Sequence, residues 1–325
     1  MLKVSVIIPV YKVEQWIERC ARSLFVQTLE EVEYIFVDDC SPDRSIEVLK
    51  RVLAEFPQRK GQVKIIRHTE NRGVSVSRQD GLDAATGEYV IHADPDDWVE
   101  INMLERLYKK AKADDADMVI CDFYQVNPKS GRKQYFAQRP EVLDAESVQR
   151  QLFRNLHGCV WNKLVKLEVI RKANIRFPED YSFCEDLTFN TELLNQPLKI
   201  TYLPEAFYNY AWSATGGSLS SAYSEKIERE ERLMNQRVLS LLADRPESAE
   251  LARLKFDTMN AARILKYVSV CSAEFKHRFA SLRNRIKIAP VGKLTGICLR
   301  LALAGHLRTA RLLFNFVQKM RDSIG

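Results

Sequence analysis

Short apolar runs alternate with helical patterns over the first 123 residues of the chain. The runs are rich in β-branched residues and lie at 4–8, 34–37, 63–66, 89–91 and 118–121. Apolar residues at helical spacing fill the intervals at 13–26, 74–85 and 101–113, and Ser41-Pro42 has the sequence of a helix start. Short apolar strands that alternate with helices predict an α/β fold with a mostly parallel sheet covered on both faces.

The remainder of the chain has a different pattern. Residues 125–140 are polar and rich in turn residues, which predicts a loop. Helix and strand signals mix between 144 and 212, and from about 224 to the end the pattern is helical. We therefore expect an α/β domain over 1–223 and a helical C-terminal region over 224–325.

The fourth predicted strand ends in an acidic turn, His92-Ala93-Asp94-Pro95-Asp96-Asp97-Trp98. Like charges held close together repel one another unless a cation lies between them. A hard divalent cation with oxygen ligands suits this position, and such a cation often keeps a phosphate as a further ligand. Asp94 and Asp96 are thus predicted to form a metal–diphosphate site. Asp97 stands three positions before Glu100, which is capping-box spacing and predicts a helix start.

Polar residues follow four of the predicted strands at the point where each strand ends. In an open parallel sheet, ligands bind in the crevice beyond the carboxyl ends of the strands. The residues concerned are Pro9-Val10-Tyr11, Asp38-Asp39-Cys40-Ser41, His68 with Asn71-Arg72-Gly73, and Asp94-Pro95-Asp96. We expect these segments to form one binding site.

These motifs resemble those of the family 2 glycosyltransferases, which are inverting enzymes with the GT-A fold. The resemblance covers roughly residues 3–220 and lies in Ser5–Tyr11, Val37–Asp43, Asn71–Leu82, Asp94–Asp96 and the pair Glu185-Asp186. It implies a Rossmann-like, mostly parallel sheet flanked by helices, followed by a C-terminal helical extension. Residues 1–123 would form the nucleotide-sugar half of the domain, and 124–223 the acceptor half.

The resemblance also implies roles for the residues of the nucleotide site. Asp38 or Asp39 would bind the base of a UDP-sugar, and Asp94 would contact the ribose or the metal. Asp96 would ligate the Mg²⁺ or Mn²⁺ ion that bridges the diphosphate. Further nucleotide contacts are implied for Pro9, Tyr11, Arg72, Gly73 and Arg78; for the two arginines a basic surface role is an alternative.

The implied catalytic residues are Asp186 and Glu185. Inverting transfer needs one base, which takes the proton of the acceptor hydroxyl, whereas the leaving diphosphate is stabilised by the cation. We expect Asp186 to be this base and Glu185 to have a positioning role. Both residues stand at a predicted helix start, so capping of that helix is the alternative.

Several other positions carry weaker signals. Cys40 stands where the family usually has Gly, and a left-handed backbone there would be strained. Trp161 precedes the acidic pair and is expected to pack in the core. The alternating aromatics Tyr208, Tyr210 and Trp212 are more typical of sheet packing than of sugar stacking. The loop at 215–218 would either close over the donor or form a plain turn.

The charge of the chain is unevenly distributed. The net charge is +6, yet residues 276–321 hold eleven Lys and Arg and no acid, which leaves 38 bases against 43 acids, a balance of −5, elsewhere. Apolar residues interleave with these bases, as in an interfacial helix. We expect peripheral association with an anionic membrane through 276–321, with a solvated helical cap as the alternative.

The sequence has no apolar run of 18 residues and no signal peptide, and its seven cysteines lack zinc or redox spacing. A cytoplasmic protein is expected, with peripheral association at the inner membrane face as the further expectation. The expected partners are a nucleotide-sugar donor and a glycan or lipid-linked acceptor, with no nucleic acid. Two alternatives are a sugar-phosphate nucleotidyltransferase, which would need a glycine-rich loop after the first strand, and a non-catalytic nucleotide-binding scaffold.

Overall fold

The computed structural model describes residues 2–212, 224–268, 270–286 and 292–324. The chain divides into two compact units. The sheet unit comprises Met1–Gln149 and Leu156–Trp212, and the helical unit comprises Arg150–Asn155 and Ser213–Gly325. The predicted domain boundary between 223 and 224 adjoins residues outside the described part, and the predicted loop at 215–218 lies outside it altogether.

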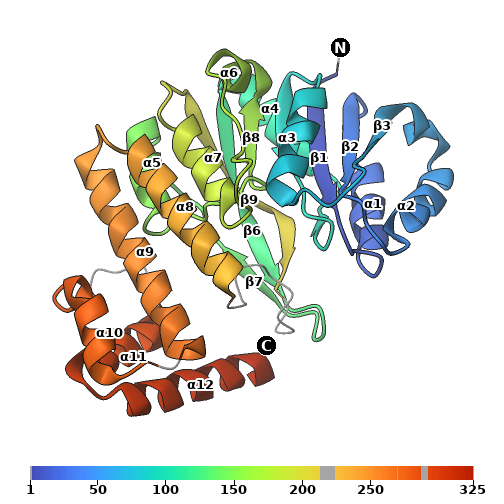
Figure 1. Ribbon diagram of the computed structural model, residues 1–325. Coiled ribbons are helices and arrows are strands. Elements are labelled where there is room, and N and C mark those ends of the chain that lie inside the picture. Colours follow the sequence, from blue (N-terminus) through green and yellow to red (C-terminus); the bar gives the residue numbers. More distant parts are fainter. Residues whose placement is uncertain (1, 213–223, 269, 287–291, 325) are drawn as a thin grey trace. The chain divides into compact units, whose positions relative to one another are not determined.

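Four parallel strands form the first part of the sheet (Figure 1). Their order is β3 (Val63–Arg67), β2 (Val32–Asp38), β1 (Val4–Val10) and β4 (Tyr89–His92). Val10 pairs with Asp38, and Ile7 pairs with His92. The carboxyl ends of these strands therefore meet at one edge of the sheet, as the sequence predicts.

The second part of the sheet mixes strand directions. β8 (Lys163–Lys166) runs antiparallel to both β4 and β6 (Met118–Val126), and β6 is parallel to β9 (Ile200–Ala211). The short β5 (Trp98–Val99) and β7 (Lys133–Phe136) are antiparallel additions to β9 and β6. The expected mostly parallel sheet is confirmed, although β7 occupies part of the stretch 125–140 that the sequence predicts to be a loop.

Helices cover both faces of the parallel part. On one face, α1 (Ile17–Phe25), α2 (Ser45–Ala54) and α4 (Met103–Ala113) bury apolar side chains in one cluster with alternate residues of β1 and β2. On the other face lies α3 (Val74–Ala84). A Cβ at Gly81 would lie 2.4 Å from Cγ2 of Ile7, so the glycine allows α3 to pack directly on β1. The remaining elements of the sheet unit are η1 (Pro57–Gln62), α5 (Ala145–Leu152, which continues into the helical unit), α6 (Leu167–Lys172) and α7 (Glu185–Leu193).

Two predicted helix starts are wrong. The helix after β2 begins at Ser45 and not at Ser41-Pro42, because the Asp43 carboxylate accepts hydrogen bonds from the Ser41 hydroxyl and the Ser45 backbone and so holds a turn there. Asp97 does not cap a helix either. It precedes β5, and its carboxylate accepts a hydrogen bond from the backbone N–H of Ala211 on β9.

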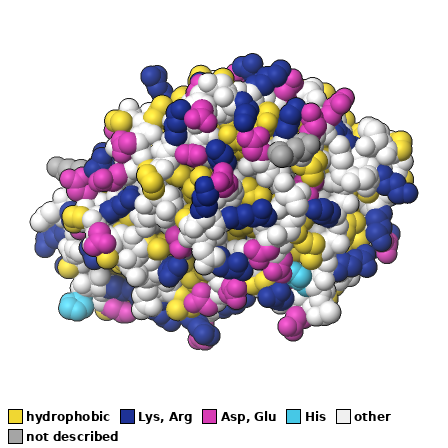
Figure 2. Space-filling model, turned by 90° about the horizontal axis from the view of Figure 1, so that it is seen from above, with side chains coloured by type: hydrophobic (Ala, Val, Ile, Leu, Met, Phe, Trp, Pro, Cys, Tyr) yellow, Lys and Arg dark blue, Asp and Glu magenta, His cyan; other side chains and the backbone are white. Residues whose placement is uncertain are grey.

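The helical unit contains α8 (Glu225–Leu241), α9 (Pro246–Tyr267), α10 (Ser272–Arg278), η3 (Ala280–Leu282), α11 (Lys293–Ala304) and α12 (Leu307–Ile324). Residues of α9 to α12 share one apolar core, and a buried Arg263–Glu231 ion pair of 2.5 Å links α9 to α8. None of the helices in the described ranges combines the length and apolar character that a bilayer crossing requires. Figure 2 shows one face of the molecule, on which basic and acidic side chains are interspersed, so charges of one sign do not cover this face.

Candidate active site

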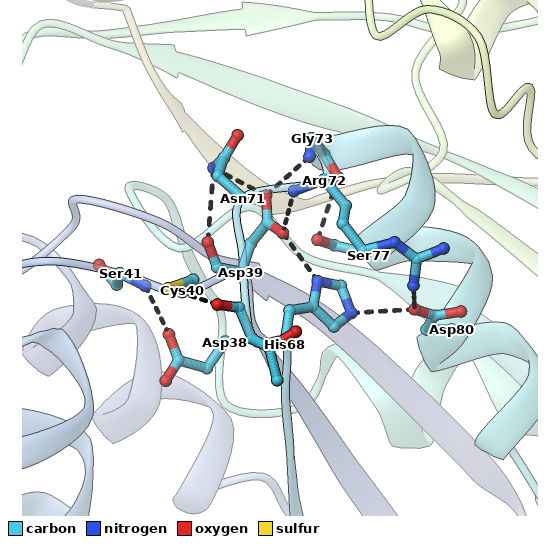
Figure 3. Close-up of polar contacts among 11 residues, drawn as sticks. Asp38, Asp39, Cys40, Ser41, His68, Asn71, Arg72, Gly73, Ser77 and Asp80 are labelled. Carbon is cyan, nitrogen blue, oxygen red and sulfur yellow. Dashed lines mark hydrogen bonds and ion pairs between the residues drawn. The ribbon is translucent and has the colours of Figure 1, made fainter.

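Asp39, at the end of β2, holds the loop that follows β3. Its buried carboxylate accepts hydrogen bonds from the backbone N–H groups of Arg72 (2.7 Å) and Gly73 (2.8 Å) and from the Asn71 amide (2.9 Å). Nδ1 of His68 lies 2.7 Å from the same carboxylate (Figure 3). The two oxygens thus have four partners, which matches the four acceptor sites of a carboxylate.

A second carboxylate extends this network onto α3. Oδ2 of Asp80 lies 2.9 Å from Nε2 of His68 and accepts a hydrogen bond from Nη1 of Arg72 at 3.0 Å (Figure 3). His68 therefore stands between two carboxylates, with a hydrogen bond at Nδ1 and a close contact without hydrogen-bond geometry at Nε2, a bridge that the sequence does not predict. Arg72 is half exposed at the edge of the network, and its free surface faces solvent.

The turn after β2 brings the other predicted base-binding residue to the same edge. Asp38 accepts a hydrogen bond from the Ser41 backbone N–H at 3.0 Å, and Nε of Arg67 lies 3.8 Å from its other oxygen. Cys40 has a φ of 55°, so the strained left-handed backbone considered from the sequence is present. Asp38 is engaged by fewer protein donors than Asp39.

The end of β1 supplies the two other predicted nucleotide contacts. Pro9 is buried within the strand, whereas Tyr11 lies just beyond it and is 39% exposed. The Nζ of Lys12 lies 5.1 Å from the centre of the Tyr11 ring. Tyr11 thus presents an aromatic ring at the site edge, while Pro9 has only its backbone to offer.

Gly73 brings the 71–73 loop against the segment that precedes α7. Its φ is 90°, and a Cβ there would lie 2.6 Å from Oγ of Ser182. Ser75, the second residue of α3, donates a hydrogen bond to the carbonyl of Pro178 in the same segment. Gly73 thus lets the backbone of the 71–73 loop lie close to Ser182.

The acidic turn after β4 is fixed from two sides. The backbone N–H of Asp94 donates to the Tyr208 hydroxyl at 2.9 Å, and Asp97 is bound by β9 as described above. On the other side, Nη2 of Arg19 donates to the Asp96 carbonyl at 2.8 Å, and its guanidinium lies 3.7 Å from the centre of the Trp98 ring. Arg19 carries no motif, so sequence reasoning could not have singled it out.

The carboxyl groups of this turn repel one another. Asp96 is exposed, but the surrounding protein still excludes part of the water from its carboxyl group. This desolvation is the larger cause and the negative charge of Asp94 the smaller one, and together they raise the pKa of Asp96 to about 6. Burial, followed by the charges of Asp96 and Asp94, raises the pKa of Asp97. A cation at the turn would relieve this repulsion.

The predicted acidic pair stands at the first two positions of α7. Glu185 is buried and Asp186 is partly exposed, so Asp186 is the more accessible of the two. Burial and the charge of Asp186 raise the pKa of Glu185 to about 7, and burial also raises the pKa of Asp186. The N-cap residue is Cys184, in a left-handed conformation with φ 53°. Oδ1 of Asp186 accepts a hydrogen bond from the Leu187 backbone N–H at 2.7 Å, so Asp186 satisfies a donor of the first turn, as the capping alternative expects, and Oδ2 is left for another partner.

Arg78 connects the acidic pair to the acidic turn. Nη2 donates to Oδ1 of Asp94 at 2.7 Å, and Nε donates to Oε1 of Glu185 at 3.0 Å. The side chain is 6% exposed. The family resemblance implies a nucleotide contact for Arg78, whereas the hydrogen bonds of its guanidinium in the structure are to carboxylates.

A buried lysine lies on the other side of the acidic pair. Lys163 donates three hydrogen bonds, to the carbonyls of His157 and Cys159 and to Oδ1 of Asn162. Burial lowers the pKa of Lys163. The positive charge of Lys163 offsets part of the rise that burial causes in the pKa of Asp186. Trp161 stacks on Tyr208 with ring centres 4.3 Å apart, so the expected core packing of these aromatics is confirmed.

The carboxylates of Asp94 and Asp96 fit a divalent cation that takes its other coordination positions from a bound ligand. Within the described ranges, no group of three His, Cys, Asp or Glu residues is arranged to hold a metal ion. Asp94 is partly exposed and Asp96 is exposed, and together they offer oxygen donors of the kind that Mg²⁺ and Mn²⁺ prefer. One or two carboxylates plus phosphate oxygens is the usual arrangement for Mg²⁺.

The architecture of the chain, with acidic loops at the carboxyl ends of its strands, is that of a glycosyltransferase with the GT-A fold. The family model described as Glycosyl transferase family 2 matches residues 5–172, which is 168 of the 325 residues and thus more than half of the chain. The chain belongs to this family, whose members transfer sugars.

Known proteins support the same assignment. The glycosyltransferase EpsJ of Bacillus subtilis is 35% identical over 215 residues, which cover 64% of this chain and 60% of EpsJ. The structure of S. aureus TarS 1-349 is similar with a TM-score of 0.62 at 20% identity and covers 98% of this chain and 92% of that one. A mannosyltransferase from Pyrobaculum calidifontis, PcManGT, has a TM-score of 0.52 at 16% identity, with 98% and 86% covered. The chain spans less than two thirds of the first curated relatives, and the two structural likenesses show the fold alone.

Proposed function

We propose that the chain is an inverting glycosyltransferase that moves a sugar from a nucleotide-sugar donor, a UDP-sugar, to a hydroxyl of a glycan or lipid-linked acceptor. The observation that carries the proposal is the meeting of the acidic turn, Arg78 and the Glu185-Asp186 pair at the carboxyl ends of the strands. The likeness to TarS, whose structures include complexes with UDP and UDP-GlcNAc, supports this donor class. TarS is named a poly(ribitol-phosphate) β-N-acetylglucosaminyltransferase, which supports a glycan acceptor.

In the proposed reaction Asp186 is the base. The acceptor oxygen attacks the anomeric carbon and gives its proton to the Asp186 carboxylate, while the bond between that carbon and the diphosphate breaks and the nucleoside diphosphate leaves unprotonated. The raised pKa of Asp186 makes it a stronger base than an exposed aspartate. Its partial exposure lets an acceptor reach it, which the buried Glu185 does not allow.

The other residues bind and orient the donor. Asp94 and Asp96 would hold Mg²⁺ or Mn²⁺, which when bound neutralises charge on the leaving diphosphate. The structure of PcManGT, which has a similar fold, is a complex with GDP-Man and Mn²⁺. Tyr11 offers its exposed ring to a nucleotide. Asp38 has spare acceptor capacity for a base N–H, whereas Asp39 would first have to release one of its four partners.

The test is the Asp186→Asn variant, because an amide keeps the shape but cannot take the proton. We expect UDP affinity, measured by calorimetry, to stay within about twofold, while turnover falls about 10²–10⁴-fold, the usual contribution of a general base. Asp180→Asn is the matched control, since Asp180 is exposed in the segment before α7. Unchanged turnover in Asp186→Asn would move the base to another residue, with Glu185 first in line.

We further propose that residues 276–321 bind reversibly to an anionic membrane, where a lipid-linked acceptor would be presented. Leu312 and Phe316 of α12 are 72% and 60% exposed and stand one helical turn apart. The exposed Arg308 precedes them by one more turn. An apolar stripe beside cationic residues fits the interface of a bilayer with anionic headgroups.

A further inference from the structure

Arg78 has a geometry that the proposed reaction does not yet use. It lies on α3, and its two hydrogen bonds reach the turn after β4 and the first residue of α7, which is 107 residues further along the chain. These segments carry the metal-binding carboxylates and the proposed base. One guanidinium therefore joins the donor side of the site to its acceptor side.

The contacts leave Arg78 only one guanidinium nitrogen, Nη1, to offer a nucleotide. Two of its three guanidinium nitrogens are occupied by carboxylates at 2.7 and 3.0 Å, and the side chain is almost fully buried. The third nitrogen, Nη1, is buried as well and has no hydrogen-bond partner in the described residues. A planar guanidinium with fixed donor directions can hold two carboxylates at a set separation, which a lysine ammonium cannot do.

Without this link the two acidic segments would repel each other. Asp94, Glu185 and Asp186 all interact with the charge of Arg78, and burial of the group is outweighed by these carboxylates, which raise its pKa. We propose that Arg78 is a positioning residue: it fixes the acidic turn against the start of α7, so that the diphosphate and the Asp186 carboxylate face the same reacting carbon. This inference rests on the proposed function.

The experiment compares Arg78→Lys and Arg78→Gln with Arg176→Lys as the matched control. In the described part of the chain, Arg176 forms ion pairs with the exposed Asp83 and Glu179, neither of which belongs to an acidic segment of the site. Misplacement of reacting groups by about 1 Å can cost about 10²-fold in rate. We therefore expect Arg78→Lys to lower kcat by about 10–100-fold while the donor KM and the UDP Kd change by less than about threefold.

A readout without turnover keeps the proposal separate from the proposed function. Hydrogen exchange of peptides that cover 93–98 and 183–188 should speed up in both segments together in Arg78→Lys, by about tenfold or more, and not in Arg176→Lys. Arg78→Gln should show a larger effect if it folds. Unchanged exchange in both peptides would overturn the proposal, even if the wild-type protein turned over no donor.

Kinetics supply the second refutation. If Arg78→Lys raised the donor KM and UDP Kd by tenfold or more at nearly wild-type kcat, Arg78 would be a diphosphate ligand acting through Nη1 and not a positioning residue. A wild-type protein without transferase activity, combined with coupled exchange at both segments, would count against the proposed function and leave the link standing.

Discussion

The Asp39→Asn variant tests whether Asp39 holds the loop after β3. Asparagine keeps one acceptor oxygen and replaces the other with an NH₂ group, which has two donors and no acceptor. In the structure both oxygens of Asp39 face donors, with Asn71, Arg72, Gly73 and His68 around them. With the NH₂ group toward Asn71 and Gly73, two donors lose their acceptor. With the NH₂ group toward Arg72 and His68, the Arg72 N–H loses its acceptor, and Nδ1 of His68 keeps a partner only in the tautomer in which it accepts.

The size of the effect follows from these contacts. Hydrogen bonds to a charged group contribute about 1.5–3 kcal/mol each, so loss of one or two in a buried position should lower the free energy of unfolding by about 1.5–6 kcal/mol. This is a large part of the total stability of a domain, which is about 5–15 kcal/mol. The Asn71–Gly73 loop would lose its place beside the segment before α7 at the same time.

Urea unfolding is the assay, with Asp38→Asn as the matched control. Asp38 accepts one backbone hydrogen bond and has a distant arginine at 3.8 Å, so the same chemical change should cost only about 0.5–1.5 kcal/mol. Asp39→Asn with a stability within about 1 kcal/mol of the wild type would refute the reasoning. If such a variant also lost UDP affinity, Asp39 would be a base ligand in the first place.

Three further predictions follow from the site and the helical unit. Asp96→Ala should abolish transfer and weaken Mn²⁺-dependent UDP binding, while Asp180→Ala should behave like the wild type; full activity of Asp96→Ala with Mn²⁺ would disprove the metal site. The pKa of Asp96 is raised to about 6, so protons compete with the cation for its carboxylate below that pH. The Mn²⁺ affinity measured with UDP present should therefore be constant above pH 7 and fall by up to about tenfold per pH unit below pH 6. A flat affinity profile from pH 5 to 8 would exclude Asp96 as a ligand. The double variant Leu312→Ser/Phe316→Ser should co-sediment less with anionic liposomes than the wild type. The control Val142→Ser/Leu143→Ser, which changes two exposed apolar residues of the sheet unit, should co-sediment as the wild type does. If the wild type bound neutral vesicles equally well, or did not bind anionic ones, segment 276–321 would be a solvated helical cap.

The sheet could be predicted from the sequence because its central strands are buried on both faces. Such strands read as continuous β-branched runs, and each predicted run falls within an observed strand. The polar segments at their ends could be placed together for the same reason, since parallel strands share one carboxyl edge.

What the sequence could not reveal are contacts between segments far apart in the chain. Asp97 has capping-box spacing, but a backbone N–H of β9, 114 residues away, takes its carboxylate and decides the local structure. An arginine at position 78 is a residue type that commonly binds phosphate, and only the folded chain, which brings Glu185 to 3.0 Å from its guanidinium, shows that its partners are carboxylates. The bridge that His68 makes between Asp39 and Asp80 likewise depends on how closely α3 packs on the sheet.

The most direct test of the account is turnover of the purified protein with a panel of nucleotide sugars in the presence of Mn²⁺, read by nucleotide release and by the mass of the acceptor product. We predict that at least one UDP-sugar is consumed and UDP is released, that the acceptor gains one sugar mass with inverted anomeric configuration, and that EDTA stops the reaction. Release of pyrophosphate in place of UDP, product with retained configuration, or transfer that persists in EDTA would contradict this prediction.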